Sequence, residues 1–175
     1  MTTRVGFLRA VNVGRRTVAN ARVVELLEGL GYTDVWTYVN SGNVVFTAPG
    51  RREALERAIG RALEAEYGFE VTTFVRSAAE LRRLADAHPF DLAPGDTYFV
   101  TFLPGPPAAA AARALEAQSN DFDTLVVAGR DVHWRMRGKS TDTTVTPARW
   151  KQALGTTATT SRNMTSLTKL IDRLP

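Results

Sequence analysis

The first 76 residues alternate between short apolar runs and longer stretches in which apolar residues recur every three or four positions. Short apolar runs that end at turn residues predict buried strands, whereas the longer repeat predicts a helix that packs by one face. Asn20 is expected to cap the first helix and Gly31 to end it. The expected order is strand, helix, strand, strand, helix, strand, at 4–11, 20–31, 35–39, 44–48, 52–67 and 70–76.

The second half of the chain repeats this order of elements. Between the halves, Ser77 and Glu80 form the S-x-x-E pattern of a capping box, which predicts a linking helix that stops before Pro89. Gly129 and Arg130 are placed to turn a second hairpin. The six elements of this half are expected at 97–103, 106–118, 123–128, 131–136, 146–155 and 156–162.

Similar segments close the two halves. Residues 75–84 (VRSAAELRRL) align with residues 161–170 (SRNMTSLTKL), and in both an arginine at a strand end precedes a helix-capping residue and two leucines three positions apart. This pattern indicates a structural duplication. We therefore expect an α+β fold of two ferredoxin-like (βαββαβ) units in tandem, packed as one compact globule. The expected parts are a first unit at 1–76, a linking helix and loop at 77–96, and a second unit with a C-terminal helix at 97–175.

Composition narrows the classes of function that fit. The chain has no cysteine and only two histidines, which excludes disulfides and a thiolate nucleophile and leaves no expected metal site and no expected cofactor. No signal peptide or membrane-spanning run is expected, so the sequence predicts a soluble, cytoplasmic protein with no membrane partner. The net charge of +4 comes mostly from arginine, which suits phosphate and carboxylate ligands.

Four segments in this order resemble one protein family: GFLRAVNVG, YVNSGNVVF, HPF and TSRNMTSLTKL. The chain is similar over its whole length to the bacterial domain-of-unknown-function family numbered 1697. The resemblance implies an α+β fold of paired ferredoxin-like units and brings no settled activity. Ala10 and Arg15 stand where family members often have glycine, which argues against a ligand that needs close backbone approach at this loop. Met164 stands where members tend to have tryptophan, so a stacking role at that position does not carry over.

The stretch YVNSGNVVF places four polar or turn residues between two apolar runs. Gly42 supplies the positive φ of a tight hairpin, and the asparagines can satisfy the backbone of the turn. These polar groups exceed the needs of a two-residue turn, so we also expect them to form one wall of a site. The leading hypothesis is a binding protein for a small anionic or nucleotide-like ligand, with six contacts from both halves of the chain. These residues are Arg9, Asn12, Ser41, Asn43, Arg162 and Asn163.

Two other classes of function stay open. His133, Arg135 and Arg137 alternate with apolar residues along one predicted strand, and such a basic stripe on a sheet face fits RNA or single-stranded DNA. A hydrolase or transferase that uses the arginine and asparagine cluster is the other alternative, although no pair of carboxylates has the spacing of a general acid and base. The GKST segment at 138–141 is not a phosphate-binding loop, because the position that requires glycine is His133, inside a predicted strand.

Overall fold

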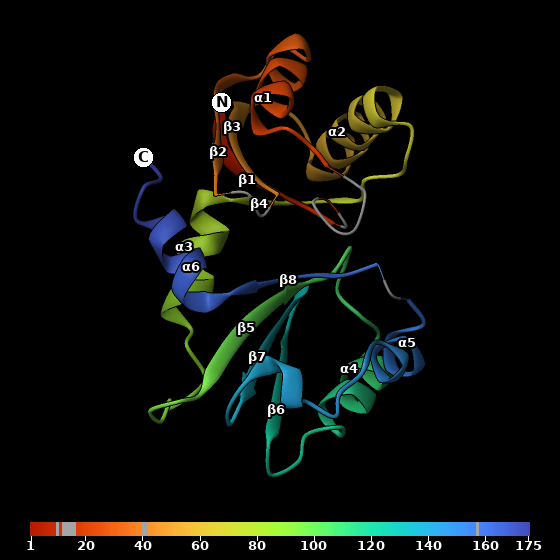
Figure 1. The fold of residues 1–175 in the computed structure, drawn as a ribbon, viewed down its shortest axis with the longest axis vertical. Helices are drawn as coiled ribbons and strands as arrows, with labels where there is room; N and C mark the ends of the chain where they lie inside the picture. Colours follow the sequence, from red (N-terminus) through yellow and green to blue (C-terminus); the bar gives the residue numbers. More distant parts are fainter. Residues whose placement is uncertain (10, 12–16, 40–41, 157) are drawn as a thin grey trace. The chain divides into compact units, whose positions relative to one another are not determined.

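The computed structural model describes residues 1–9, 11, 17–39, 42–156 and 158–175 (Figure 1). The chain divides into two compact units. The first comprises Met1–Asp86 and Leu170–Pro175, and the second comprises Ala87–Lys169. The finer boundaries expected from the sequence, with a separate linking segment at 77–96, stay a prediction.

The first unit has the expected βαββαβ order and a four-stranded antiparallel sheet in the strand order β2-β3-β1-β4. This is the strand order of a ferredoxin-like unit, in which the two strands that flank each helix are not adjacent in the sheet. A further helix, α3, follows the last strand and packs on β1 and β4. The elements are β1 (Thr2–Leu8), α1 (Asn20–Gly29), β2 (Thr33–Tyr38), β3 (Asn43–Ala48), α2 (Arg52–Tyr67), β4 (Thr73–Ser77) and α3 (Ala78–Asp86).

The second unit repeats this topology in the order β6-β7-β5-β8, again with antiparallel neighbours. The predicted α+β fold with two ferredoxin-like units is therefore confirmed. The elements are β5 (Thr97–Phe102), α4 (Ala109–Glu116), β6 (Asp123–Ala128), β7 (Asp131–Met136), the 3-10 turn η1 (Ser140–Asp142), α5 (Pro147–Leu154) and β8 (Thr160–Asn163). The final helix, α6 (Met164–Ile171), begins in the second unit, and its last two residues belong to the first.

The pairing of residues between strands is equivalent in the two sheets. In the first sheet, Val5 pairs with Val45 on one side and with Arg76 on the other. In the second sheet, Val100 pairs in the same way with His133 and Arg162. Arg76 and Arg162 therefore occupy equivalent positions in the two units, as the aligned segments of the sequence indicate.

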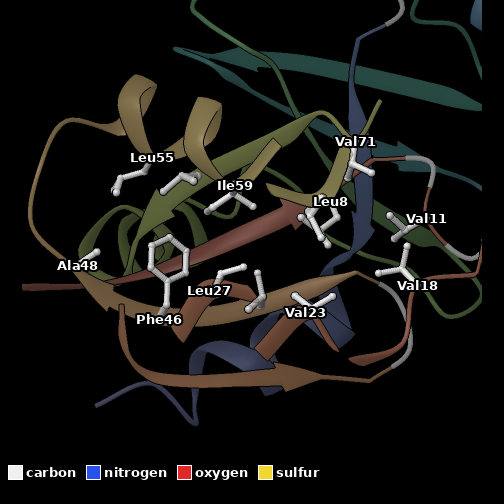
Figure 2. Packing of buried hydrophobic residues seen from close by; sticks show 13 residues of the cluster. Leu8, Val11, Val18, Val23, Leu27, Phe46, Ala48, Leu55, Ile59 and Val71 are labelled. Carbon is white, nitrogen blue, oxygen red and sulfur yellow. The ribbon is translucent and has the colours of Figure 1, made fainter. Parts of the chain in front are cut away.

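In the first unit, α1 and α2 cover one face of the sheet (Figure 1). Figure 2 shows Leu27 of α1 and Ile59 of α2 beside Phe46 of β3, and all three side chains are fully buried. Each such side chain contributes about 1.5–3 kcal/mol through removal of apolar surface from water. In the second unit, α4 and α5 pack against each other, and a smaller core that includes Leu115 and Trp150 lies beneath them.

Local signals in the sequence had mixed success. The capping box is confirmed, because Ser77 Oγ accepts a hydrogen bond from Glu80 N at 3.2 Å and Glu80 Oε2 accepts one from Ser77 N at 2.7 Å. The prediction that Asn20 caps α1 is wrong, since the extended residue before the helix is Ala19 and no side chain caps it. The helix expected at 106–118 is shorter, because Pro106 and Pro107 precede it and it begins at Ala109.

In each sheet, a glutamate on the helix that precedes one edge strand accepts a hydrogen bond from a backbone N–H of that strand. Glu56 Oε1 on α2 accepts a hydrogen bond from Val75 N in β4 at 2.8 Å. Glu116 Oε1 on α4 accepts one from Val127 N in β6 at 2.8 Å. Both strands stand at an end of the strand order, so these carboxylates satisfy N–H groups that no neighbouring strand reaches.

Within the described part of the chain, no helix combines the length and the apolar character needed to cross a bilayer.

Candidate functional site

The second unit contains a pocket of about 350 Å³ between its sheet and α5. Strands β5 and β8 supply its floor, and Trp134 of β7 supplies its wall together with the segment 143–147 and α5. We call it the tryptophan–threonine pocket, because two indole rings and five hydroxyl side chains dominate its lining. The lining residues are Thr101, Trp134, Thr143, Val145, Thr146, Pro147, Trp150, Thr159 and Ser161.

A pair of hydroxyl groups lies in the floor of the pocket. Thr101 of β5 and Ser161 of β8 are register partners, so their side chains share one face of the sheet. Their Oγ atoms are 2.7 Å apart and share a hydrogen bond. Because the two hydroxyls satisfy each other, the buried Thr101 costs little without a ligand, and the pair can still offer a donor and lone pairs to one.

Two tryptophans form the apolar wall. The ring centroids of Trp134 and Trp150 are 5.5 Å apart with an interplanar angle of 58°. Trp150 is the single buried residue of α5, so this ring anchors the helix to the unit. Indole rings give a flat apolar surface against which a planar or ring-shaped ligand can pack.

A buried carboxylate stands behind this wall. Asp123 of β6 has no exposed surface, and its Oδ1 accepts hydrogen bonds from Trp134 Nε1 at 2.8 Å and Thr143 Oγ1 at 2.7 Å. The carboxylate is not itself part of the lining. Its two partners are, so Asp123 fixes groups on two sides of the pocket.

The beginning of α5 lies at the pocket. Thr146 caps the helix by accepting a hydrogen bond from Arg149 N, and Pro147 occupies the first turn, where its missing N–H leaves no partner unsatisfied. No acidic residue lies in this turn, and among the described residues no carboxylate lines the pocket, although Asp123 behind it bonds the segment before the helix. The positive end of the helix dipole favours an anionic group at the first turn.

A second, wider hollow of about 890 Å³ lies between α4 and α5. Its walls carry alanines of both helices together with exposed polar residues such as Asn120, Asp121 and Gln152. Its described lining includes the ring of Phe122 but neither indole ring, and it does not include the hydroxyl pair of Thr101 and Ser161. The smaller pocket is therefore the better candidate for recognition of a small ligand.

Two of the predicted contacts in the first half of the chain, Arg9 and Asn43, are described by the structure. Asn43 is 4% exposed, and its Nδ2 donates a hydrogen bond to the carbonyl oxygen of Tyr38 at 3.2 Å across the hairpin. The cavity beside Asn43 measures only about 10 Å³. Arg9 is half-buried directly after β1, and its backbone N donates to Thr72 O at 2.9 Å. Asn12 and Ser41 lie outside the described residues.

The predicted contacts in the second half are neighbours at the end of β8. Arg162 Nη1 donates to Thr160 Oγ1 at 2.8 Å and to the carbonyl oxygen of Ser161 at 2.9 Å. Burial lowers the pKa of Arg162 to about 10. Asn163 Oδ1 accepts a hydrogen bond from Thr165 N at 2.9 Å and caps α6, as the aligned segments indicated. Convergence of these residues with Arg9 and Asn43 stays a prediction.

The proposed basic stripe differs from the sequence expectation at His133. This side chain is 2% exposed, and its Nδ1 shares a hydrogen bond with the hydroxyl group of Tyr98. Burial lowers the pKa of His133 and raises the pKa of Tyr98 to about 12. Arg135 packs its guanidinium 5.5 Å from the ring of Phe90 and donates to Thr124 Oγ1 at 2.7 Å. Among the three residues, only Arg137 is exposed.

The tryptophan–threonine pocket was not predicted from the sequence. The alternation of residues 131–136 predicts a strand, and residues 146–155 predict a helix, and both elements are present. The missing information was long-range. Pairing of Thr101 with Ser161 joins residues that are far apart in the chain, and no local signal fixes that register.

Within the described residues, no group of three or more histidine, aspartate or glutamate side chains is arranged to hold a metal ion.

Comparisons with known proteins agree with the fold. The structure is similar to that of conserved bacterial protein SP0830 from Streptococcus pneumoniae, over 98% of this chain and 97% of that one, with a TM-score of 0.73 and 22% sequence identity. At this identity the likeness concerns the fold alone. No curated protein sequence matches the chain significantly. The model of a family described as protein of unknown function (DUF1697) matches residues 1–133, and the chain therefore belongs to the DUF1697 family.

Proposed function

We propose that this protein binds a small nucleotide-like ligand, with a planar or ring-shaped part and an anionic group, in the tryptophan–threonine pocket. The observation that carries the proposal is the combination of two indole rings and a fixed hydroxyl pair around about 350 Å³ of space. Pockets for small ligands begin at roughly 300 Å³ and combine apolar walls with a few placed polar groups.

The ring-shaped part of the ligand packs on the indole wall. Stacking of a nucleobase on an aromatic side chain contributes about 1–3 kcal/mol and tolerates differences between bases. The hydroxyls of Thr101 and Ser161 then supply donors and acceptors for the polar edge of the ring or for a sugar. A wall of rings over a floor of hydroxyls suits a ligand that is apolar on its faces and polar along its rim.

The anionic group of the ligand sits at the first turn of α5. The dipole of this helix attracts negative charge, and no acidic side chain of the turn opposes it. Lys151 lies four residues after the pocket residue Pro147, so the two share one helical face. Its exposed ammonium group adds a positive charge on the side of α5 that borders the pocket.

Tryptophan fluorescence tests the proposal. The chain has three tryptophans, of which Trp134 and Trp150 line the pocket and Trp36 lies on β2. Nucleosides, nucleoside monophosphates, sugar phosphates and inorganic phosphate are titrated separately. We expect a saturable change in emission with nucleoside monophosphates, which Trp36→Phe keeps and Trp150→Phe largely removes. Absence of a saturable change with every compound would refute the proposal.

Two matched substitutions separate the two parts of the ligand. Ser161→Ala removes a hydroxyl from the floor and should weaken the binding of nucleosides and nucleotides alike. Lys151→Gln removes a charge and should weaken the binding of nucleoside monophosphates, while nucleosides bind as before. Equal effects of Lys151→Gln on charged and uncharged compounds would show that the anionic group does not lie at α5.

The arginine and asparagine cluster is a second proposed site for an anionic ligand. Arg162 favours it, because a guanidinium whose pKa is lowered by burial gains most from a nearby anion. Inorganic phosphate should then raise the melting temperature of the protein, and Arg162→Gln should remove this effect whereas Lys151→Gln keeps it. The opposite result would assign the phosphate to α5. A hydrolase or transferase at the same cluster stays a prediction.

A further inference from the structure

We infer that Asp123 is the positioning residue of the tryptophan–threonine pocket, because its carboxylate holds Trp134 and Thr143 in the orientation that receives the ligand. The inference rests on the proposed function and adds the residue that shapes the site. Asp123 lines no part of the pocket, and its effect on the ligand therefore passes through its partners.

One oxygen of this carboxylate serves both sides of the pocket. Oδ1 accepts hydrogen bonds from Trp134 Nε1 of β7 at 2.8 Å and from Thr143 Oγ1 of the segment before α5 at 2.7 Å. Both distances are those of good hydrogen bonds to a carboxylate. The indole plane and the threonine rotamer are thereby fixed by the same atom.

The other oxygen holds the backbone of that segment. Asp123 Oδ2 accepts a hydrogen bond from Thr144 N at 3.3 Å, and Asn120 Nδ2 lies 3.5 Å away. Thr143 Oγ1 in turn accepts from Val145 N at 3.0 Å. Residues 143–145 lead directly into the cap of α5, so the carboxylate also sets where this helix begins relative to the sheet of its unit.

Burial gives this arrangement its strength. Asp123 has no exposed surface, and a carboxylate in that environment is stable only when donors surround it. An indole N–H, a hydroxyl, a backbone N–H and, at 3.5 Å, the side-chain amide of Asn120 supply them. Loss of the charge would weaken these bonds together, because hydrogen bonds to an ionised acceptor are about twice as strong as neutral ones.

The test uses Asp123→Asn, with Asp121→Asn as the control. Asp121 is an exposed carboxylate two residues away that does not line the pocket. In the amide variant an NH₂ group replaces one of the two oxygens, so the two donors to that oxygen lose their acceptor and the bonds to the remaining oxygen lose the negative charge. NMR of the indole N–H groups reads the orientation of Trp134, whose signal is assigned with Trp134→Phe. Adenosine 5′-monophosphate is the binding probe, followed by fluorescence.

We expect Asp123→Asn to shift the Trp134 indole signal and to weaken binding of the probe by about 10-fold, which corresponds to the loss of one charge-assisted hydrogen bond. Asp121→Asn should change neither readout. If Asp123→Asn does not fold, Thr143→Val takes its place. This variant removes one of the two donors to Oδ1, so the indole signal of the other donor, Trp134, must change.

The outcomes separate the inference from the proposed function. A probe that binds the wild type and Asp123→Asn equally overturns the inference and leaves the proposed function standing. If the wild type binds no probe, the proposed function fails, and the indole signal alone decides whether Asp123 orients Trp134. An unchanged signal in both Asp123→Asn and Thr143→Val overturns the inference in either case.

Discussion

Substitution of Gly42 by alanine tests why the hairpin between β2 and β3 turns where it does. Gly42 has a φ of +72°, a conformation that residues with a Cβ adopt at a cost. A Cβ at this position would lie 2.5 Å from Val11 Cγ2 and 3.2 Å from both the Cβ and the carbonyl oxygen of Leu8. The substitution therefore adds a steric cost to a conformational one.

A second glycine provides the matched control. Gly68 also has a φ of +72°, where it ends α2, and a Cβ there would meet no atom within 4 Å. Both glycines belong to the first unit, so their alanine variants report on the same cooperative structure. The difference between the two variants isolates the contact with Val11 and Leu8.

The expected magnitudes follow from these two terms. The left-handed conformation costs about 1–2 kcal/mol for alanine, partly offset by about 0.4–1 kcal/mol from the reduced freedom of the unfolded chain. Gly68→Ala should therefore lower the free energy of unfolding by about 1 kcal/mol. Gly42→Ala should lower it by a further 1–3 kcal/mol or so, which is typical of an overpacked interior. Leu8 offers little relief, since its contacting atoms belong to β1 itself.

Urea unfolding followed by far-ultraviolet circular dichroism measures both free energies, provided that the dependence on urea concentration stays the same. Equal losses in the two variants, within about 0.5 kcal/mol, would refute the steric argument. The turn would then need glycine only for its backbone angle.

Two further predictions concern stability. Burial lowers the pKa of His133, so between its folded value and the ordinary value of about 6.5 the unfolded chain binds more protons than the folded one. The free energy of unfolding should therefore fall as the pH drops below about 6.5, although the charge of Asp131 raises this pKa. His133→Gln should flatten that fall. His88→Gln at the exposed histidine should keep most of it, because burial lowers the pKa of His133 more than the charge of His88 does. A wild-type curve without slope between pH 5 and 6.5 would contradict this. Ser77→Ala removes one half of the capping box and should cost about 1 kcal/mol in thermal unfolding. An unchanged melting temperature would mean that Glu80 alone caps α3.

Sequence patterns predicted the fold well because its signals are local. The capping box at Ser77 and the end of α1 at Gly31, whose φ is +82°, depend on residues within one turn of each other. Apolar periodicity then indicated which face of each helix packs. The error at Asn20 has the same origin, because a cap requires a particular backbone angle, and Ala19 adopts it one residue earlier.

Sequence patterns predicted the candidate site less well, since recognition depends on tertiary pairing. Asn43 is a polar residue in a predicted turn, and the hydrogen bond from its amide to the carbonyl oxygen of Tyr38 across the hairpin could not be predicted from its position in the sequence. Conversely, nothing in the sequence pointed to Asp123, because no second carboxylate lies at the spacing of a general acid and base. Its donors come from β7 and from the segment before α5, and only the folded unit brings them to one carboxylate.

The glutamates at the sheet ends have a consequence for how the protein behaves at high concentration. An edge strand with unpaired backbone groups can pair with strands of other molecules, and proteins usually prevent this with lysine, proline or a bulge on the strand itself. Here the carboxylates of Glu56 on α2 and Glu116 on α4 each accept a hydrogen bond from a backbone N–H of an edge strand. Protection therefore lasts only while α2 and α4 are folded. Partial unfolding of either helix would expose a template for intermolecular strand pairing before the sheet itself is lost.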